Sequence, residues 1–231
     1  MSGILYGVGV GPGDPELLTI KALKRIEKSP VIAVPAREKE RSAAYKIVAQ
    51  AVKDLNEKEI LCIDMPMTRD REKLLFSHKA GAEQLIRILD QGKDIAFLTL
   101  GDPGIYSTYM YLHRLVAGKG YQAEIISGVP SFCAASALLG EELVKSDEML
   151  HLVPSAYGVE DALKMSGTKV LMKAGKKMPQ IRRRLEEMDA EAHMVENCGM
   201  ANEKIYHGVD QMPEDAGYYS LIIVKNKRGA C

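Results

Sequence analysis

Two glycine-rich loops, each containing an aspartate, hold the residues of this chain that are best suited to chemistry. The first loop occupies residues 7–15 and ends on Gly13-Asp14-Pro15, and the second contains Gly101-Asp102-Pro103-Gly104. Glycine lets the backbone approach a ligand closely and adopt positive φ, whereas proline fixes its own φ and removes a donor. Loops of this kind bind a small, polar, flat ligand through main-chain groups. The pattern therefore predicts a ligand site built largely from backbone.

Each loop lies between a strand-like run and a helix-like run. The first follows a predicted strand at residues 4–10, and Asp14 can cap a helix that has Pro15 in its first position. The second follows a predicted strand at 95–100 and leads into a predicted helix at 106–117. Ligands of open α/β sheets bind at the carboxyl ends of strands, so both loops fall where such a ligand is expected.

The remaining periodicity predicts two α/β domains. Strand-like and helix-like runs alternate in the first half, as in a parallel sheet, whereas the last strands are joined without long helices and predict a mixed sheet. Gly118-Lys119-Gly120 is the predicted linker, giving domains at 1–118 and 119–231. The other predicted strands are 31–34, 59–63, 123–126, 149–153, 168–173, 191–196, 204–207 and 219–224, and the other predicted helices follow Ser42 or span 70–90, 131–139 and 179–188.

Composition excludes several classes of protein. The chain is 46% hydrophobic and 27% charged over 231 residues, which is ordinary for a soluble globular protein. Basic and acidic residues both number 31, and this zero balance argues against nucleic acid as the main partner. The sequence shows neither a signal-peptide pattern nor a membrane-length apolar run. The scattered cysteines and histidines predict free thiols in a reducing cytoplasm and no protein-built metal site.

Other interpretations of the two loops fit the residues less well. A dinucleotide fingerprint needs a third glycine where this chain has Pro12, and an acidic residue at the end of the second strand, which here reads Ala33-Val34-Pro35. A phosphate-binding Gly-Lys-Ser/Thr motif is absent. Either loop alone would be interpreted as a tight turn with a capping aspartate. The pair favours a ligand site, in which Asp102 could also accept protons or hydrogen bonds.

The residues at this point resemble a known family. Segment 9–19 is similar to the N-terminal signature of the tetrapyrrole methylases, and Gly101-Asp102-Pro103 and segment 128–132 resemble their second and third cofactor segments. The resemblance covers essentially the whole chain. Pro130 departs from the pattern, because relatives usually carry a hydroxyl or small residue there. Within the superfamily, three stretches resemble the C20-methyltransferases of precorrin-2 or cobalt-factor II. They are residues 34–36 followed by 42–44, residues 65–70, and residues 97–103 with 106–109.

The resemblance implies two α/β domains with the active site in the cleft between them, and a homodimer. It implies S-adenosylmethionine bound in a folded conformation, largely through main-chain groups. The implied contacts are Pro12, Leu100, Gly101, Asp102, Ile105, Ser131 and Phe132, with Met172, Met200 and Ala201 from the C-terminal domain.

The implied chemistry is methyl transfer to a carboxylate-rich tetrapyrrole, with or without cobalt, in cobalamin biosynthesis. The sulfonium is already a reactive donor and the ring carbon is electron-rich, so the enzyme mainly aligns them and excludes water. A proton must then leave the carbon, and Asp102, Tyr106 or water is the expected acceptor. Arg37 and Arg69, in loops at the carboxyl edge of the sheet, are the expected carboxylate ligands, the alternative being solvated surface charge.

Two other functions are compatible with parts of this pattern. A ribosomal RNA ribose methyltransferase or a diphthine synthase would use the same fold, although zero net charge weighs against RNA and residues 66–70 favour the C20 group. A non-catalytic protein could hold the nucleoside or tetrapyrrole without turnover. Both predicted cofactor loops are intact, which favours an enzyme.

Overall fold

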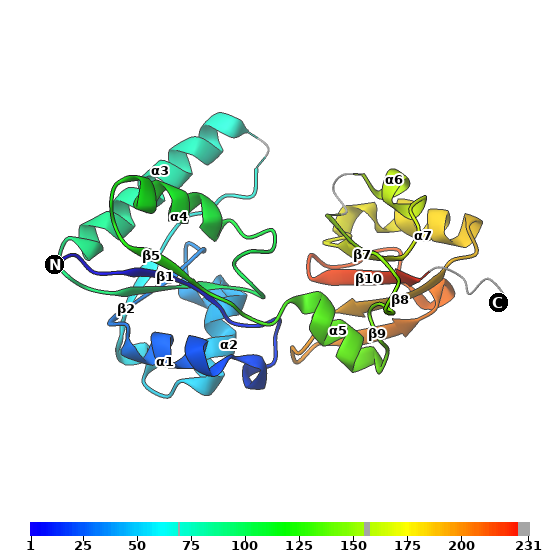
Figure 1. The fold of residues 1–231 in the computed structure, drawn as a ribbon, viewed down its shortest axis with the longest axis horizontal. Coiled ribbons are helices and arrows are strands. Elements are labelled where there is room, and N and C mark those ends of the chain that lie inside the picture. Colours follow the sequence, from blue (N-terminus) through cyan, green and yellow to red (C-terminus); the bar gives the residue numbers. More distant parts are fainter. Residues whose placement is uncertain (69, 155–157, 226–231) are drawn as a thin grey trace. The chain divides into compact units, whose positions relative to one another are not determined.

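The chain divides into two compact units, Met1–Pro130 and Ser131–Cys231. A computed structural model describes residues 1–68, 70–154 and 158–225 (Figure 1). The boundary between the units lies later than the linker predicted at Gly118-Lys119-Gly120. The reason is that β5 (Ala123–Ile126), which follows that segment, pairs in parallel with β1 (Leu5–Gly9) and so completes the sheet of unit 1.

Unit 1 contains a five-stranded parallel sheet in the order β3-β2-β4-β1-β5, with β2 at Val31–Val34, β3 at Glu59–Cys62 and β4 at Ile95–Thr99. Every neighbouring pair is parallel, so all five carboxyl ends lie at one edge. β1, β2 and β4 are buried along their whole length, as expected of parallel strands covered on both faces. Gly9 lies opposite Thr99, so the two glycine-rich loops begin side by side.

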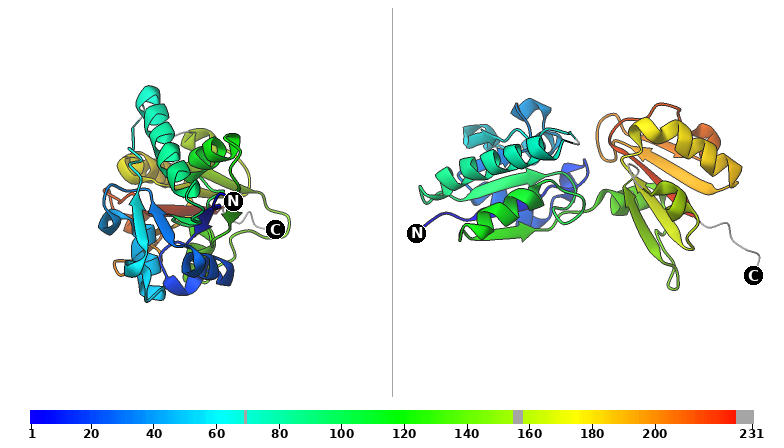
Figure 2. Two further views of the ribbon diagram at one scale, coloured as in Figure 1. Left: turned by 90° about the vertical axis from the view of Figure 1, so that its left-hand side faces the viewer. Right: turned by 90° about the horizontal axis from the view of Figure 1, so that it is seen from above.

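Two pairs of helices cover the two faces of this sheet (Figures 1 and 2). α1 (Ile20–Lys28) and α2 (Ala43–Ala51) pack on one apolar layer, and α3 (Arg71–Leu89) and α4 (Tyr109–Gly118) pack on the other. The first layer contains Val8, Ala22, Ile26, Ile32, Val48 and Leu98. The second contains Leu5, Ala33, Leu85, Leu89, Phe97 and Leu112.

Side-chain caps fix where these helices begin. The Oδ1 of Asp70 accepts from the amides of Glu72 and Lys73 at the start of α3, and Ser42 caps α2, as predicted. The helix predicted directly after Asp14 is instead two elements. Asp14 caps only a short 3₁₀ turn at Pro15–Leu17, and Thr19 caps α1.

Two predicted helices of unit 1 therefore differ from the structure. Ile20, which the apolar spacing places on the buried face of the first helix, is 72% exposed. The helix predicted from residue 106 begins at Tyr109, because Tyr106 has a φ of 48° and cannot continue a right-handed helix.

Unit 2 contains a mixed sheet in the order β6-β7-β10-β8-β9, as the sequence predicted. The strands are β6 (Leu150–Pro154), β7 (Thr168–Met172), β8 (Glu191–Glu196), β9 (Lys204–His207) and β10 (Ser220–Lys225). Only β6 and β7 pair in parallel among these described strands. The helices are α5 (Ser131–Leu139), α7 (Met178–Glu187) and a short α6 (Val159–Leu163) that the sequence did not predict. A separate apolar core includes residues of α6, α7 and one face of the sheet.

Candidate functional site

The two glycine-rich loops of unit 1 are joined by their backbones. The amide of Gly101 donates to the carbonyl of Gly11 at 2.8 Å, and the amide of Gly11 donates back to the carbonyl of Gly101 at 3.3 Å. The amide of Val10 also donates to the carbonyl of Thr99 at 3.0 Å. The loops after β1 and β4 therefore continue the pairing of their strands beyond the sheet, and their relative position is fixed without side chains.

A third loop, after β5, packs against the same backbone. A Cβ placed on Gly128 would lie 2.3 Å from the carbonyl oxygen of Gly101, and one placed on Gly9 would lie 2.6 Å from both that oxygen and the nitrogen of Gly128. Only glycine fits at positions 9 and 128. We call this convergence of residues 9–14, 100–108 and 127–130 the three-loop site.

Gly101 differs from these packed glycines. Its φ is +68°, and apart from its own two chain neighbours no residue comes within 4 Å of the position that a Cβ would take. Open space beside a left-handed backbone lets a ligand reach main-chain groups directly. Of the other predicted cofactor contacts in unit 1, Pro12 is buried directly after Gly11, and Leu100 and Ile105 are half-buried in the second loop.

Asp102 joins the second and third loops through its side chain. Its Oδ1 accepts from the amide of Gly104 at 2.7 Å, and its Oδ2 accepts from the amide of Gly128 at 3.0 Å. The first bond is a local Asx turn, whereas the second crosses to another loop. Asp102 thus lies in the three-loop site, with both carboxylate oxygens engaged by backbone donors.

Tyr106, the other predicted proton acceptor, lies at the outer end of the second loop. Its side chain is 47% exposed and its φ of 48° is an unusual conformation for a bulky residue. The next residue is anchored, because Ser107 Oγ lies 2.9 Å from Thr99 Oγ1 and accepts from the amide of Tyr109 at 3.2 Å. This contact between two hydroxyl groups was not predicted from the sequence. The signal that could have indicated it is the presence of a hydroxyl residue at each end of the glycine-rich loop.

Arg37, a predicted substrate ligand, lies in the loop after β2 and is bound to Asp64 in the loop after β3. The Nη2 and Nε atoms of Arg37 each lie 3.0 Å from Oδ2 of Asp64, and both side chains are largely exposed. This hydrogen bond to the carboxylate raises the pKa of the Arg37 guanidinium, which stays cationic. Arg69, the second predicted substrate ligand, lies outside the described residues.

Three of the predicted contacts of unit 2 lie at one edge of its sheet. β7 and β8 are both antiparallel to β10, so their carboxyl ends point the same way. Met172 ends β7 and is 9% exposed, and the loop 197–203, which contains Met200 and Ala201, follows β8. The amide of Met200 donates to the carbonyl of Asn197 at 2.8 Å and tightens that loop. Ser131 and Phe132, the remaining predicted contacts, are the first two residues of unit 2 and begin α5.

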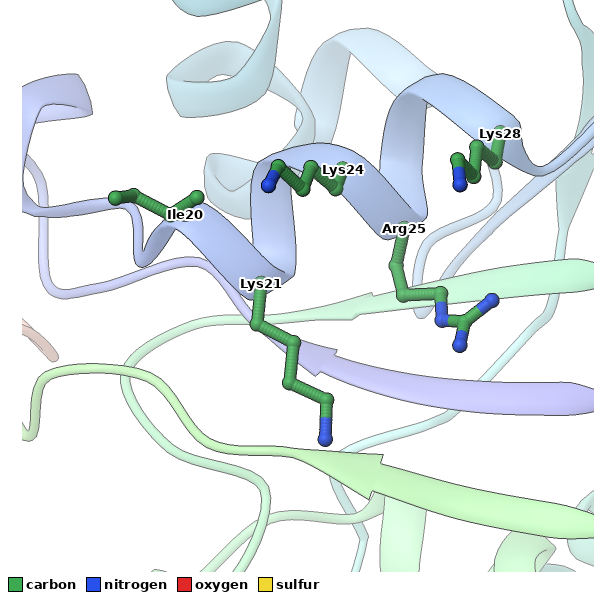
Figure 3. A pocket seen from close by; sticks show the side chains of 5 residues that line it. All are labelled: Ile20, Lys21, Lys24, Arg25 and Lys28. Atoms are coloured by element: carbon green, nitrogen blue, oxygen red, sulfur yellow. The ribbon is translucent and has the colours of Figure 1, made fainter.

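A pocket on α1 contains none of the predicted site residues. It has a volume of about 430 Å³, and Figure 3 shows the side chains that line it, all projecting from α1: Ile20, Lys21, Lys24, Arg25 and Lys28. The guanidinium of Arg25 lies 4.2 Å from the ring centroid of Tyr6. This is an open, basic helix surface, and the three-loop site is the better ligand candidate because its geometry is imposed by packed backbone.

Neither a metal centre nor a membrane-spanning helix is found in the described ranges. No group of three or more histidine, cysteine, aspartate or glutamate side chains in those ranges could hold a metal ion. No helix formed by these residues is long and apolar enough to cross a membrane. Cys62, Cys133 and Cys198 are free thiols, and burial raises the pKa of the first two.

Comparison with known proteins identifies the family of the chain. A family model described as Tetrapyrrole (Corrin/Porphyrin) Methylases matches residues 4–211. The chain is 34% identical over 228 residues to a probable cobalt-precorrin-2 C(20)-methyltransferase of Methanocaldococcus jannaschii, covering 96% of this chain and 95% of that protein. It is 32% identical over 242 residues to a precorrin-2 C(20)-methyltransferase of Sinorhizobium sp, covering 97% of each.

Solved structures share the fold. A uroporphyrin-III C-methyltransferase from Thermus thermophilus, complexed with S-adenosylhomocysteine, superposes with a TM-score of 0.72 at 20% identity, covering 96% of this chain and 97% of that one. A cobalt precorrin-4 methyltransferase superposes with the same TM-score, 0.72, at 20% identity, covering 96% and 94%. The predicted α/β fold of this family is confirmed. By sequence and by fold, this chain belongs to the tetrapyrrole (corrin/porphyrin) methylases.

Proposed function

We propose that the protein transfers a methyl group from S-adenosylmethionine to C20 of precorrin-2 or of its cobalt-containing form, in cobalamin biosynthesis. One observation carries this proposal: identity of 34% and 32% to two C(20)-methyltransferases over nearly the whole length of all three chains. A third relative, the cobalt-precorrin-2 C(20)-methyltransferase of Salmonella typhimurium, is 27% identical over 236 residues. Two of these relatives act on the cobalt form by name and one on precorrin-2, so both substrates are retained.

The three-loop site fits S-adenosylmethionine. The open space beside the left-handed backbone of Gly101 leaves room for a ligand to pack against the second loop. When bound, the cofactor supplies an electrophilic methyl group on its sulfonium sulfur. The residues proposed to hold it are Pro12, Leu100, Gly101, Asp102 and Ile105 of unit 1, and Ser131, Phe132, Met172, Met200 and Ala201 of unit 2. The predicted location of the active site between the two domains stays a prediction.

Arg37 is the described residue that we propose for the substrate's carboxylates. Its guanidinium has a planar array of donors suited to a carboxylate. It already binds Asp64 in an exposed pair, so the group can hold a carboxylate in this orientation. Solvent screens such a pair strongly, so exchange of Asp64 for a substrate carboxylate has a small cost. Arg69 is proposed for the same role on the sequence pattern alone.

The protein's own chemical work is placement, exclusion of water and removal of one proton. The ring carbon loses a proton after it gains the methyl group, and the proposed acceptors are water and Tyr106, which is half-exposed at the rim of the second loop. The homodimer implied by the resemblance is proposed as well, and light scattering on the purified protein tests it.

An anaerobic assay with metal-free and cobalt-containing substrate side by side tests the proposed reaction. We expect at least one substrate to become one methyl group heavier, with S-adenosylhomocysteine formed in equal amount. A Gly101→Val variant is the matched negative control, because its side chain fills the open space. No methylation of either substrate by the wild-type protein would reject the proposal.

The alternative activities are not favoured. The relatives from Methanocaldococcus jannaschii, Sinorhizobium sp and Salmonella typhimurium are all C(20)-methyltransferases by name, and not ribosomal RNA methyltransferases or diphthine synthases. Methyl-label assays on ribosomes and on elongation factor distinguish these activities. A non-catalytic protein would bind S-adenosylmethionine without forming S-adenosylhomocysteine in a single-turnover experiment.

A further inference from the structure

The carboxylate of Asp102 is the side-chain bridge between the second and third loops. One oxygen holds the turn of its own loop through the amide of Gly104, and the other accepts from the amide of Gly128. The two loops are far apart in sequence and belong to separate strand ends. Packing alone presses them together at Gly101 and Gly128, and the bridge at 3.0 Å adds a directional contact to that packing.

The neighbouring contacts show why this bridge matters. The third loop begins with Ser127, whose carbonyl accepts at 3.3 Å from Oγ1 of Thr19, the residue that caps α1. The next residue, Gly128, donates its amide to Asp102 and so connects the third loop to the second. A hydrogen bond to a charged acceptor is about twice as strong as a neutral one. The bond between Gly128 and Asp102 is therefore stronger than the bond between Thr19 and Ser127. Without the bond to Asp102, the third loop is held against Gly101 by packing alone.

We propose that Asp102 is a positioning residue, whose carboxylate holds the second and third loops in the arrangement that the cofactor needs, and that it does not accept the proton released by the substrate. A proton taken up by either oxygen would weaken a bond to a backbone amide that shapes the site. The bridge itself is independent of the reaction. Its consequence for S-adenosylmethionine rests on the proposed function.

Hydrogen exchange of the apo protein tests the bridge without any ligand. Asp102→Asn preserves the side-chain volume but replaces one acceptor oxygen by a donor, and Asp102→Ala removes both acceptors. We expect amide exchange in peptides covering 127–130 to accelerate about 10- to 100-fold in Asp102→Ala, the equivalent of losing one charge-assisted hydrogen bond. In Asp102→Asn, amide exchange in the same peptides should also accelerate, but by a smaller factor.

Asp94→Asn is the matched control. Oδ1 of Asp94 accepts from the amide of Ile4 at 2.8 Å, again across a long sequence separation, but immediately before β4, at the opposite end of that strand. Its substitution should leave exchange at 127–130 and the affinity for S-adenosylhomocysteine unchanged. Circular dichroism checks that all three variants are folded. If Asp102→Ala does not fold, Asp102→Asn still provides the test.

Two functional measurements separate positioning from proton transfer. Calorimetry with S-adenosylhomocysteine should show about 10-fold weaker binding for Asp102→Asn, and the pH dependence of single-turnover methylation should keep the wild-type shape. Wild-type exchange at 127–130 in Asp102→Ala would overturn the bridge. So would wild-type exchange at both 127–130 and Gly104 in Asp102→Asn, whose single acceptor oxygen cannot replace both carboxylate oxygens. Wild-type affinity together with an altered pH profile would instead identify Asp102 as the proton acceptor. A wild-type protein that methylates nothing would reject the proposed reaction, and the exchange result would still decide the bridge.

Discussion

The two units hold their predicted ligand contacts in different ways. In unit 1 the three-loop site is backbone packed on backbone, with glycines 9 and 128 so close to the carbonyl of Gly101 that no side chain fits. In unit 2 the predicted contacts include two residues with long apolar side chains, Met172 at the end of β7 and Met200 in a loop after β8. The geometry of the site in unit 1 is therefore fixed by packed backbone, whereas the loop after β8 in unit 2 offers a half-buried side chain, Met200, that can change without disturbing the sheet.

The largest effect should come from a packed glycine of unit 1. Gly128→Ala places a Cβ 2.3 Å from the carbonyl oxygen of Gly101, and the backbone must move apart. We expect a loss of unfolding free energy on the order of 3 kcal/mol, together with loss of cofactor binding. Gly118→Ala, where a Cβ meets no atom within 4 Å, is the control. Urea unfolding curves measure both, and equal stability of the two variants would contradict the packing.

Gly101→Ala should separate binding from stability. Its Cβ meets no protein atom within 4 Å, so the cost is the left-handed backbone, about 1–2 kcal/mol. The same Cβ enters the space assigned to the ligand, and we expect no measurable binding of S-adenosylhomocysteine by calorimetry. Affinity equal to the wild type would place the ligand elsewhere.

A side-chain contact of unit 2 should have a smaller effect on binding and almost none on folding. Met200 is half-buried in the loop after β8. Met200→Ala is expected to weaken S-adenosylhomocysteine binding about tenfold, or about 1.4 kcal/mol, through lost apolar contact. Its urea midpoint should stay at the wild-type value. A large fall in stability would show that this loop supports the fold of unit 2 and would remove the contrast between the units.

The smallest effect on the protein itself is expected at Arg37. Because its pair with Asp64 is exposed, Arg37→Ala should leave both stability and S-adenosylhomocysteine affinity unchanged while it weakens tetrapyrrole binding about tenfold. Arg183→Ala, which removes a similarly exposed pair with Glu187 in unit 2, is the control. Substrate titration followed by absorbance measures the difference. Identical substrate affinity of the two variants would make Arg37 an ordinary surface charge.

The sequence predicted unit 1 well where a feature depends only on residues that are adjacent in the chain. Ser42 caps its helix as expected, the helix predicted at 70–90 is present at Arg71–Leu89, and the strands that carry the two loops end within a residue of their predicted limits. The break between Asp14 and Thr19 was missed because both residues are good caps and only tertiary packing selects where α1 begins.

Long-range contacts could not be predicted from the same signals. The place of β5 in unit 1 depends on its pairing with β1, and a glycine-rich segment before it suggested a linker instead. The tie from Asp102 to Gly128 depends on two strand ends meeting, which no local pattern contains. The residue types of the site were therefore predictable, whereas the work that each residue does there required the fold.

A crystal structure of the protein with S-adenosylhomocysteine would show whether the three backbone loops of unit 1 bind the methyl donor. We expect the nucleoside in the open space beside Gly101, with hydrogen bonds from main-chain groups of residues 100–105. A nucleoside bound on the basic surface of α1, or one held by side chains alone away from Gly101, would contradict it.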